Sequence, residues 1–316
     1  MTINLLRDIG VTSLPTKPNE IESKLICFLQ FGWLFTEKAA REIIGENVLC
    51  SGGYSKNLVK IVKMLFLSRT KSLEAFHRLS CLGIQHLSTA PKIAVVLSGS
   101  GVYDGSEIHE ACATLSHITR EGAEPICYAP DVQQMHVVNH VKGAPADGET
   151  RNVLVESARI ARGNIKPLSG LKASEVDGVV FPGGFGAAKN LSDFAVNGDK
   201  CKLNSEVSRV IKEFHSAKKP IALCCIAPVL AAATINGVTI TLGKTDDGSG
   251  KWPHSGAIDA AKSMGAKMEM KGVMEACVDK KNLIVTSPAF MYEGKFHEIY
   301  DGIGVMIKTL IGLVRK

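Results

Sequence analysis

The chain has 316 residues, of which 45% are hydrophobic and 22% charged, and it contains 30 glycines. Such values are typical of a globular protein with a sizeable core, built as one large domain with an appendage or as two small domains. The net charge of +6 comes mostly from residues 1–90, which carry 11 Lys and Arg against 7 Asp and Glu. The rest is nearly neutral and has no basic stripe with interleaved aromatic residues, which argues against a nucleic-acid partner.

Residues 1–90 lack the regular alternation of strand and helix patterns that is found in the rest of the chain, and we expect most of this extension to be poorly ordered. Its segment 64–90 is amphipathic, carries Arg and Ser, and has Glu74 as its only acid. This composition is typical of a mitochondrial presequence and predicts a location in the mitochondrial matrix. A presequence should begin the chain, so translation would have to start at Met64. Otherwise residues 1–63 mask the segment and the protein is cytoplasmic, or the segment is an ordinary basic helix packed on the domain.

The longest apolar stretch, Leu25 to Phe35, is interrupted by Gln30 and is too short to cross a bilayer, so no membrane span is expected. Nine cysteines are scattered along the chain without a CxxC pair. This spacing argues against a zinc ribbon or a thioredoxin-type site. Several of the cysteines lie in apolar runs, where a free thiol packs as a small hydrophobe. A reducing compartment and no metal site are expected.

From residue 91 to residue 316, short β-branched runs alternate with helical patterns at the spacing of βαβ units. Strands are predicted at Ile93–Leu97, Pro125–Ala129, Gly178–Phe181, Ile221–Cys225, Val238–Leu242 and Leu283–Thr286. Helices are predicted at Ser106–Arg120, Asn152–Arg162, Ser205–Ala217, Ala227–Thr234, Ala257–Met264 and Tyr292–Leu313. Because the strands are apolar throughout, both faces of the sheet should be covered. The pattern therefore predicts an α/β domain with a mostly parallel sheet between two layers of helices.

The stretch from Pro220 to Ala233 is the most informative for chemistry. An apolar strand runs into Cys225, and a helix of small residues begins directly after it. Such a sharp turn presents its side chain at the carboxyl edge of the sheet, where open α/β folds place their sites. The N–H groups of the helix N-terminus are expected to favour the thiolate and lower the pKa of Cys225. Cys224 should point to the opposite face of the strand and be inert. The alternative is that both cysteines are core residues.

A glycine loop, FPGGFGAAKNL, follows another predicted strand. Glycines let the backbone approach a ligand closely, and successive N–H groups can form a concavity that binds an oxyanion. A tight turn without a ligand explains the motif equally well.

Weaker patterns lie elsewhere in the domain. The GSG after the first strand resembles the start of a dinucleotide fingerprint, but Asp104 stands where the third glycine belongs. Asp104 and Glu107 have the spacing of a capping box for the first helix. His136 and His140 are spaced as metal ligands could be, but no acid or cysteine clearly joins them, so a surface pair is favoured.

Six segments together resemble one protein family: LSGSGVYDGSEIHEA, APDVQQMHVVNH, ETRNVLVESARIARG, VFPGGFGAAKNLSDFA, CCIAPVLAA and TSPAFM. They are similar to the ES1 family of mitochondrial glutamine amidotransferase-like class 1 proteins, whose bacterial relative is the glyoxalase ElbB, within the DJ-1/PfpI superfamily. The resemblance covers essentially all of residues 92–316, whereas residues 1–63 match nothing in it. It implies a flavodoxin-like three-layer sandwich of the class I glutamine amidotransferase type, a homodimer and no cofactor.

The resemblance also implies roles for single residues. Cys225 falls on the elbow cysteine of the superfamily, and Glu110 falls on the helix glutamate that hydrogen-bonds this thiol. Gly184 falls on the loop that supplies a backbone N–H beside the sulfur. Periodicity alone does not select Glu110, and Glu107 competes for its role, although helix capping would account for Glu107.

The sequence departs from the true amidotransferases at the elbow. These enzymes have a glycine-flanked elbow and a His/Glu pair, whereas this elbow reads CCIAP. Ile226 follows the nucleophile where the protease-like branch often has histidine, so neither amidase nor peptidase activity is expected. His254, in the loop WPHSG, could approach the site and is kept as a candidate, although a lone loop histidine is usually solvated.

Two functions fit this set of residues. The first is a glutathione-independent, glyoxalase-like activity on small aldehydes and dicarbonyls, with Cys225 as nucleophile, Glu110 as proton shuttle and Gly184 steadying the oxyanion. The second is a non-catalytic redox-responsive or scaffolding protein in which Cys225 is merely oxidisable.

Overall fold

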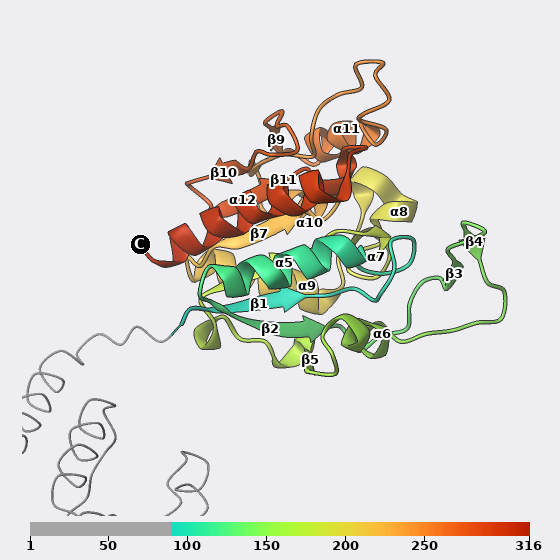
Figure 1. Ribbon diagram of the computed structural model, residues 1–316, viewed down its shortest axis with the longest axis horizontal. Coiled ribbons are helices and arrows are strands. Elements are labelled where there is room, and N and C mark those ends of the chain that lie inside the picture. Colours follow the sequence, from blue (N-terminus) through green and yellow to red (C-terminus); the bar gives the residue numbers. More distant parts are fainter. Residues whose placement is uncertain (1–89) are drawn as a thin grey trace, which may run out of the picture. The chain divides into compact units, whose positions relative to one another are not determined.

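The computed structural model describes residues 90–316, and the expectations for order and for a presequence before residue 90 lie outside the described residues. Within them, seven strands form one sheet in the order β10–β11–β7–β6–β1–β2–β5 (Figure 1). The strands are β1 (Lys92–Val96), β2 (Glu124–Ala129), β5 (Ile165–Pro167), β6 (Gly178–Phe181), β7 (Ile221–Cys224), β10 (Cys277–Asp279) and β11 (Ile284–Ser287). All neighbours pair in parallel except β10, which runs antiparallel to β11. The mostly parallel α/β fold is therefore confirmed.

The strand order reverses beside β1. The chain passes from β1 to β2 and β5 on one side and then returns to β6 on the other side of β1. In open α/β sheets, ligands bind outside the carboxyl ends of the strands at such a reversal. The topology thus predicts a site near the ends of β1 and β6.

Helices cover both faces of this sheet, as Figure 1 shows. The helices are α5 (Ile108–Arg120), α6 (Val153–Ile160), α7 (Phe185–Lys189), α8 (Phe194–Asn197), α9 (Ser205–Ser216), α10 (Pro228–Ala232), α11 (Gly256–Ser263) and α12 (Phe296–Val314). Helices α5 and α12 pack side by side on one face, and α9 lies on the other (Figure 1). The result is the three-layer sandwich that the sequence predicts.

The central strands are apolar because both of their faces are covered. Every residue of β6 and β7 is buried, and β1 is buried after its first residue. Helix α9 instead buries one stripe, which consists of Val207, Val210, Ile211 and Phe214. Their spacing of three and four residues is that of an amphipathic helix lying against a sheet.

Two expectations about local structure are wrong. The run Val238–Leu242 was predicted to join the main sheet, but only β8 (Thr239–Ile240) forms there, and it pairs with β9 (Lys267–Met268) in a separate small sheet. The capping box is also different. Glu107 is itself the N-cap of α5, and Asp104 instead accepts a hydrogen bond from the backbone of Val138 at 2.7 Å. Both errors arise because these residues are paired with segments distant in sequence.

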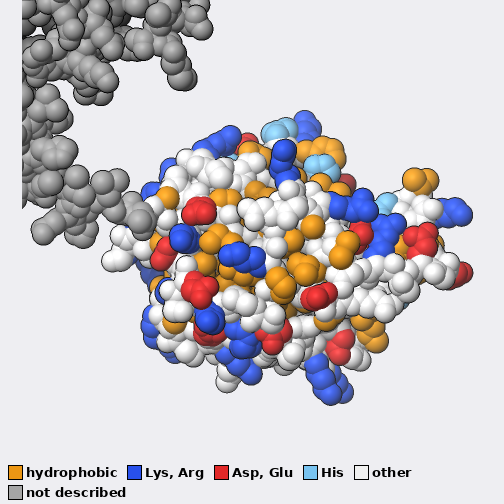
Figure 2. Space-filling view, turned by 90° about the horizontal axis from the view of Figure 1, so that it is seen from below, with side chains coloured by type: hydrophobic (Ala, Val, Ile, Leu, Met, Phe, Trp, Pro, Cys, Tyr) orange, Lys and Arg blue, Asp and Glu red, His pale blue; other side chains and the backbone are white. Residues whose placement is uncertain are grey.

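The surface in Figure 2 shows Lys and Arg side chains interspersed with Asp, Glu and apolar side chains. The face in that view therefore has no extended surface of one charge sign. Among residues 90–316, no helix is both long and apolar enough to cross a membrane.

Two glycines of α12 provide a test of how this helix packs. A Cβ at buried Gly302 would overlap the carbonyl of Val273, whereas a Cβ at exposed Gly312 would meet nothing within 4 Å. Gly312→Ala should stabilise the protein by roughly 0.5–1 kcal/mol because alanine loses less backbone entropy in a helix. Gly302→Ala should destabilise it by about 1–3 kcal/mol, the usual cost of overpacking. Urea unfolding of both variants measures this, and equal effects would contradict the packing of α12.

Candidate functional site

Cys225 lies at a strained turn directly after β7. Its φ of +58° places it in the left-handed region, which is rare for a residue other than glycine. Its N–H donates to the carbonyl of Ser287 at the end of β11, with a distance of 3.1 Å. Helix α10 begins three residues later with Pro228 at its first position. Strain of this kind persists only where the surroundings fix it, and it is common at active sites. The predicted strand-to-helix elbow is therefore present.

The Glu110 carboxyl is the polar centre of the site, and it is completely buried. Its Oε2 accepts from the N–H of Gly183 at 3.0 Å, and its Oε1 accepts from the N–H of Phe290 at 3.1 Å. Gly183 follows β6, Phe290 follows β11, and Glu110 lies in the first turn of α5, which follows β1. One carboxyl thus connects the ends of three strands.

Both neighbouring thiols face this carboxyl. Glu110 lies beside the Cys225 thiol, and its charge helps to raise the pKa of that thiol. The Cys224 sulfur also lies 3.8 Å from Glu110 Oε2. The expectation that Cys224 points away from the site is therefore wrong. Strand alternation predicts opposite faces, but the left-handed backbone of Cys225 ends that alternation.

The glycine loop after β6 approaches the thiol with its backbone. The N–H groups of Gly184 and Ile226 both donate to the Cys225 sulfur. Gly184 has a φ of +96°, so it adopts a conformation that favours glycine. A Cβ at Gly183 would overlap the Cβ of Cys225 and lie 2.5 Å from Glu110 Oε2. Both glycines are therefore required for the loop, the thiol and the carboxyl to lie together.

The environment of Glu110 keeps it protonated near neutral pH. Burial, and next the charge of Glu107, raise the pKa of Glu110 from 4.5 to about 8, against the lowering effect of the hydrogen bonds from Phe290, Cys225 and Gly183. Desolvation disfavours the charged form of a carboxyl, and a nearby like charge adds to this effect. The Glu110 carboxyl therefore loses its proton, and can act as a base, only just above neutral pH.

The pKa of the Cys225 thiol is raised, and the expected lowering by a helix N-terminus is wrong. Burial is the largest cause and the Glu110 charge is the next, while the N–H groups of Gly184 and Ile226 lower the pKa only in part. Helix α10 has five residues, so few aligned peptide groups oppose the loss of water around the sulfur. A reactive thiolate here requires that a proton leave the pair formed by Cys225 and Glu110.

The other candidates lie outside this pair. Glu107 is the N-cap of α5 and accepts from the backbone of Glu110 at 2.7 Å, so capping accounts for Glu107, although Asp104 was the expected cap. His254 is exposed in the turn before α11, and no hydrogen bond described for residues 90–316 joins it to Cys225 or Glu110. His140 contacts the backbone of Val138 and Tyr103, and the described residues contain no cluster of metal ligands around it.

Sequence reasoning missed three contributors. Gly183 and Phe290 supply the hydrogen bonds to Glu110, and Ile226 supplies an N–H to the sulfur. The PGG of the glycine loop signalled Gly183, and TSPAFM contained Phe290. Because these residues act through their backbone N–H groups, their side-chain types say little about their role in the site.

Comparison with known proteins finds close relatives. The chain is 59% identical over 233 residues to the ES1 protein homolog, mitochondrial, of Rattus norvegicus, covering 72% of this chain and 88% of the relative. It is 55% identical over 265 residues to glutamine amidotransferase-like class 1 domain-containing protein 3, mitochondrial, of Homo sapiens, covering 81% of this chain and 99% of the relative. No family model matches the chain.

A solved structure supports the same fold. It is an isoprenoid biosynthesis protein with an amidotransferase-like domain from Ehrlichia chaffeensis, 34% identical, with a TM-score of 0.63, covering 71% of this chain and 99% of that one. This likeness confirms the flavodoxin-like, amidotransferase-like fold. The curated relatives are named as mitochondrial proteins, which confirms the expected mitochondrial location.

The burial of Glu110 predicts how stability changes with pH. Between its ordinary pKa of 4.5 and its folded-state pKa of about 8, the unfolded chain ionises while the folded chain keeps the proton. The contribution of Glu110 is thus fully present below pH 4.5 and is lost as the pH rises toward 8. Relative to Glu110→Gln, the unfolding free energy of the wild type should fall across this window by on the order of 4 kcal/mol.

The two proteins are compared by how their unfolding free energies change with pH, because Glu110→Gln also destabilises the protein by an amount that does not depend on pH. The amide nitrogen of glutamine cannot accept a hydrogen bond, so the N–H of Gly183 or Phe290 loses its acceptor, at about 1–3 kcal/mol at every pH. Denaturant unfolding from pH 4.5 to pH 8 measures both effects, with Glu121→Gln at the other end of α5 as control. Parallel curves for the wild type and Glu110→Gln would show that Glu110 ionises normally.

Proposed function

This chain belongs to the family of the mitochondrial ES1 proteins and glutamine amidotransferase-like class 1 domain-containing protein 3, and we propose that it is a glyoxalase-type enzyme. It converts small dicarbonyls such as glyoxal and methylglyoxal to hydroxy acids without glutathione. The observation that carries this proposal is the buried Glu110 carboxyl, with a pKa of about 8, beside the thiol of a strained elbow cysteine. A base of this kind is matched to proton transfer near neutral pH.

The first step is addition of the thiol to the aldehyde. Once the pair has lost one proton, Glu110 takes the thiol proton and the Cys225 sulfur attacks the aldehyde carbon. The proton then passes to the aldehyde oxygen, which gives a hemithioacetal. The N–H groups of Gly184 and Ile226 already lie at the sulfur, so they are placed to stabilise negative charge that develops beside it.

The second step moves one hydrogen between adjacent carbons. The Glu110 carboxylate removes the proton from the carbon bonded to sulfur, and an enediolate forms with its charge on the former ketone oxygen. Glu110 then returns a proton to the neighbouring carbon, and the hydroxyl proton of the sulfur-bearing carbon passes to the former ketone oxygen, which gives a thioester of the hydroxy acid. Water cleaves this thioester and restores the thiol. The sum is addition of one water to the dicarbonyl, with internal oxidation of one carbon and reduction of the other.

Amide hydrolysis fits the site less well. Protonating an amine leaving group requires a general acid such as histidine beside the nucleophile. In residues 90–316, no histidine is hydrogen-bonded to Cys225 or Glu110, and the residue after the nucleophile is Ile226. We therefore do not propose glutaminase or peptidase activity.

The alternative is a redox-responsive protein without turnover. One observation favours it: Cys224 and Cys225 are adjacent and both contact the same carboxyl. A cysteine oxidised to sulfenic acid beside a second thiol can be trapped as a disulfide. This alternative requires no dicarbonyl conversion, so an assay with methylglyoxal separates the two functions.

The rate of that conversion should depend on the Glu110 base. Because Glu110 becomes a base only as it ionises, kcat/KM for methylglyoxal should rise with pH through about 8. Glu110→Gln should lower it by at least ~10²-fold, and Cys225→Ala should abolish it. Glu121→Gln, at the C-cap of the same helix, should match the wild type. Turnover that survives in Cys225→Ala, or absence of turnover in the wild type, would refute the glyoxalase function.

The route into mitochondria is proposed to be the segment 64–90. A start of translation at Met64 would bring this segment to the N-terminus, where a presequence directs import into the matrix. A reporter fused to residues 64–100 should enter mitochondria and be cleaved before about Pro91. The same reporter with Arg69 and Arg78 replaced by Glu is the control, and diffuse, unprocessed fluorescence from the unaltered fusion would contradict the proposal.

A further inference from the structure

A row of three side chains connects the buried site to the surface. Glu110 is fully buried, whereas Glu107, the N-cap of α5 three residues before it, has 9% of its side chain exposed. The Oε1 atom of Glu107 accepts from Nδ1 of His109 at 2.8 Å. The His109 side chain is 56% exposed. The row therefore runs from a sealed carboxyl, through a nearly buried one, to an imidazole in contact with water.

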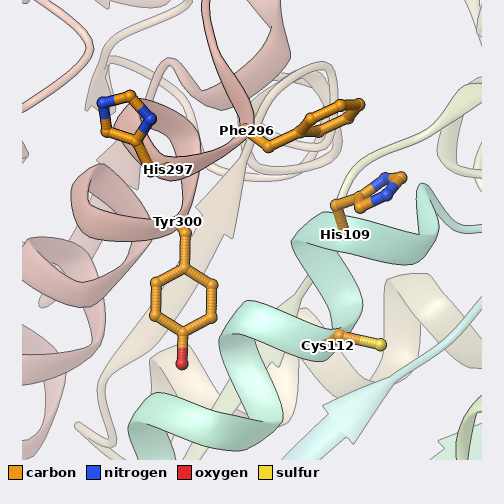
Figure 3. A pocket seen from close by; sticks show the side chains of 5 residues that line it. All are labelled: His109, Cys112, Phe296, His297 and Tyr300. Atoms are coloured by element: carbon orange, nitrogen blue, oxygen red, sulfur yellow. The ribbon is translucent and has the colours of Figure 1, made fainter.

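The outer end of the row is held in place by aromatic packing. The His109 ring lies 4.5 Å from the Phe296 ring and 6.3 Å from the Phe290 ring, measured between centroids. Figure 3 shows His109 on α5 facing Phe296 on α12, at an open groove that is also lined by His297. These contacts restrict the imidazole to the side of the helix where it reaches Glu107.

Glu110 needs a route for its proton. The side of Glu110 that faces Cys225 is occupied by substrate during turnover, and its other neighbours are the N–H groups of Gly183 and Phe290, which hold their protons, and the Cys224 thiol. Burial raises the pKa of the Cys224 thiol well above its ordinary value, so this thiol also keeps its proton. Glu107 is the remaining acidic group beside Glu110, close enough for its charge to act on that carboxyl. Glu107 Oε2 also accepts from the backbone N–H of Glu110 at 2.7 Å, which holds the Glu107 carboxyl against the turn that carries Glu110.

We infer that Glu107 and His109 form the path by which Glu110 exchanges its proton with solvent. The inference rests on the proposed glyoxalase function. The Glu110 proton passes to the Glu107 carboxylate and then to the exposed imidazole, which releases another proton to water. Histidine is suited to this role because its ordinary pKa lies near neutral pH. No electron pair or group is transferred, and each residue ends in its starting state.

Deuterium incorporation into the product measures this exchange. The full-length protein converts methylglyoxal in D₂O, and proton NMR of the lactate distinguishes hydrogen from deuterium at its second carbon. If Glu110 exchanges before it returns the proton, the product of the wild type carries deuterium. In His109→Ala, the ratio of deuterium to hydrogen should fall by at least about tenfold, since loss of a proton-transfer group costs this much or more. His297→Ala, an exposed imidazole on the same groove, should match the wild type.

Chemical rescue separates proton transfer from a structural role. Imidazole added to the buffer should restore deuterium in His109→Ala, because the position is open to solvent. If His109→Ala is unfolded by circular dichroism, His109→Gln takes its place and should show the same loss and the same rescue. Glutamine keeps a hydrogen-bonding side chain there without the ability to titrate.

Each outcome decides one of the two proposals. Unchanged deuterium in the His109 variants, loss that imidazole does not restore, or an equal loss in His297→Ala would overturn the path. Wild-type lactate without deuterium would also overturn it, since Glu110 would then keep its proton, and the glyoxalase function would stand. Absence of lactate from the wild type would overturn that function and the path with it.

Discussion

The site depends on one physical constraint, which is that the fully buried carboxyl of Glu110 must have partners for its oxygens. A carboxyl without hydrogen bonds is costly to bury. Its partners come from the loops after β6 and β11 and from the elbow after β7, so the relative position of these three segments is set by one side chain. This explains why Gly183 has no side chain and why Cys225 accepts a left-handed backbone.

The same burial governs the chemistry. Desolvation raises the pKa of both Glu110 and Cys225, so the pair is neutral at rest and has to lose a proton before the sulfur can attack. The backbone N–H groups around the sulfur oppose this only in part. In the proposed glyoxalase reaction, loss of this proton, rather than a permanently ionised sulfur, would therefore control the rate. The proposed path through Glu107 and His109 would carry the proton to solvent.

Much of the fold follows from local patterns in the sequence. Continuous apolar runs identified β1, β2, β6, β7 and β11 because strands covered on both faces need no polar alternation. The edge strands β5 and β10 were missed because their short sequences include polar residues and proline. Periodicity identified α9, since one stripe of that helix is buried. The elbow at Cys225 was also readable, because a strand that runs directly into a helix of small residues leaves little choice of turn.

The sequence by itself therefore determined the fold class, the elbow cysteine and, through resemblance, the pairing of Cys225 with Glu110. Only the tertiary structure decided the ionisation of that pair and the orientation of Cys224. A pKa depends on how much water the whole fold removes, and the local pattern, which showed a helix N-terminus, pointed in the opposite direction. Likewise, Gly183 and Phe290 act through their backbones, which no residue type encodes. Their roles exist only because parallel strands bring segments that are distant in sequence to one edge of the sheet.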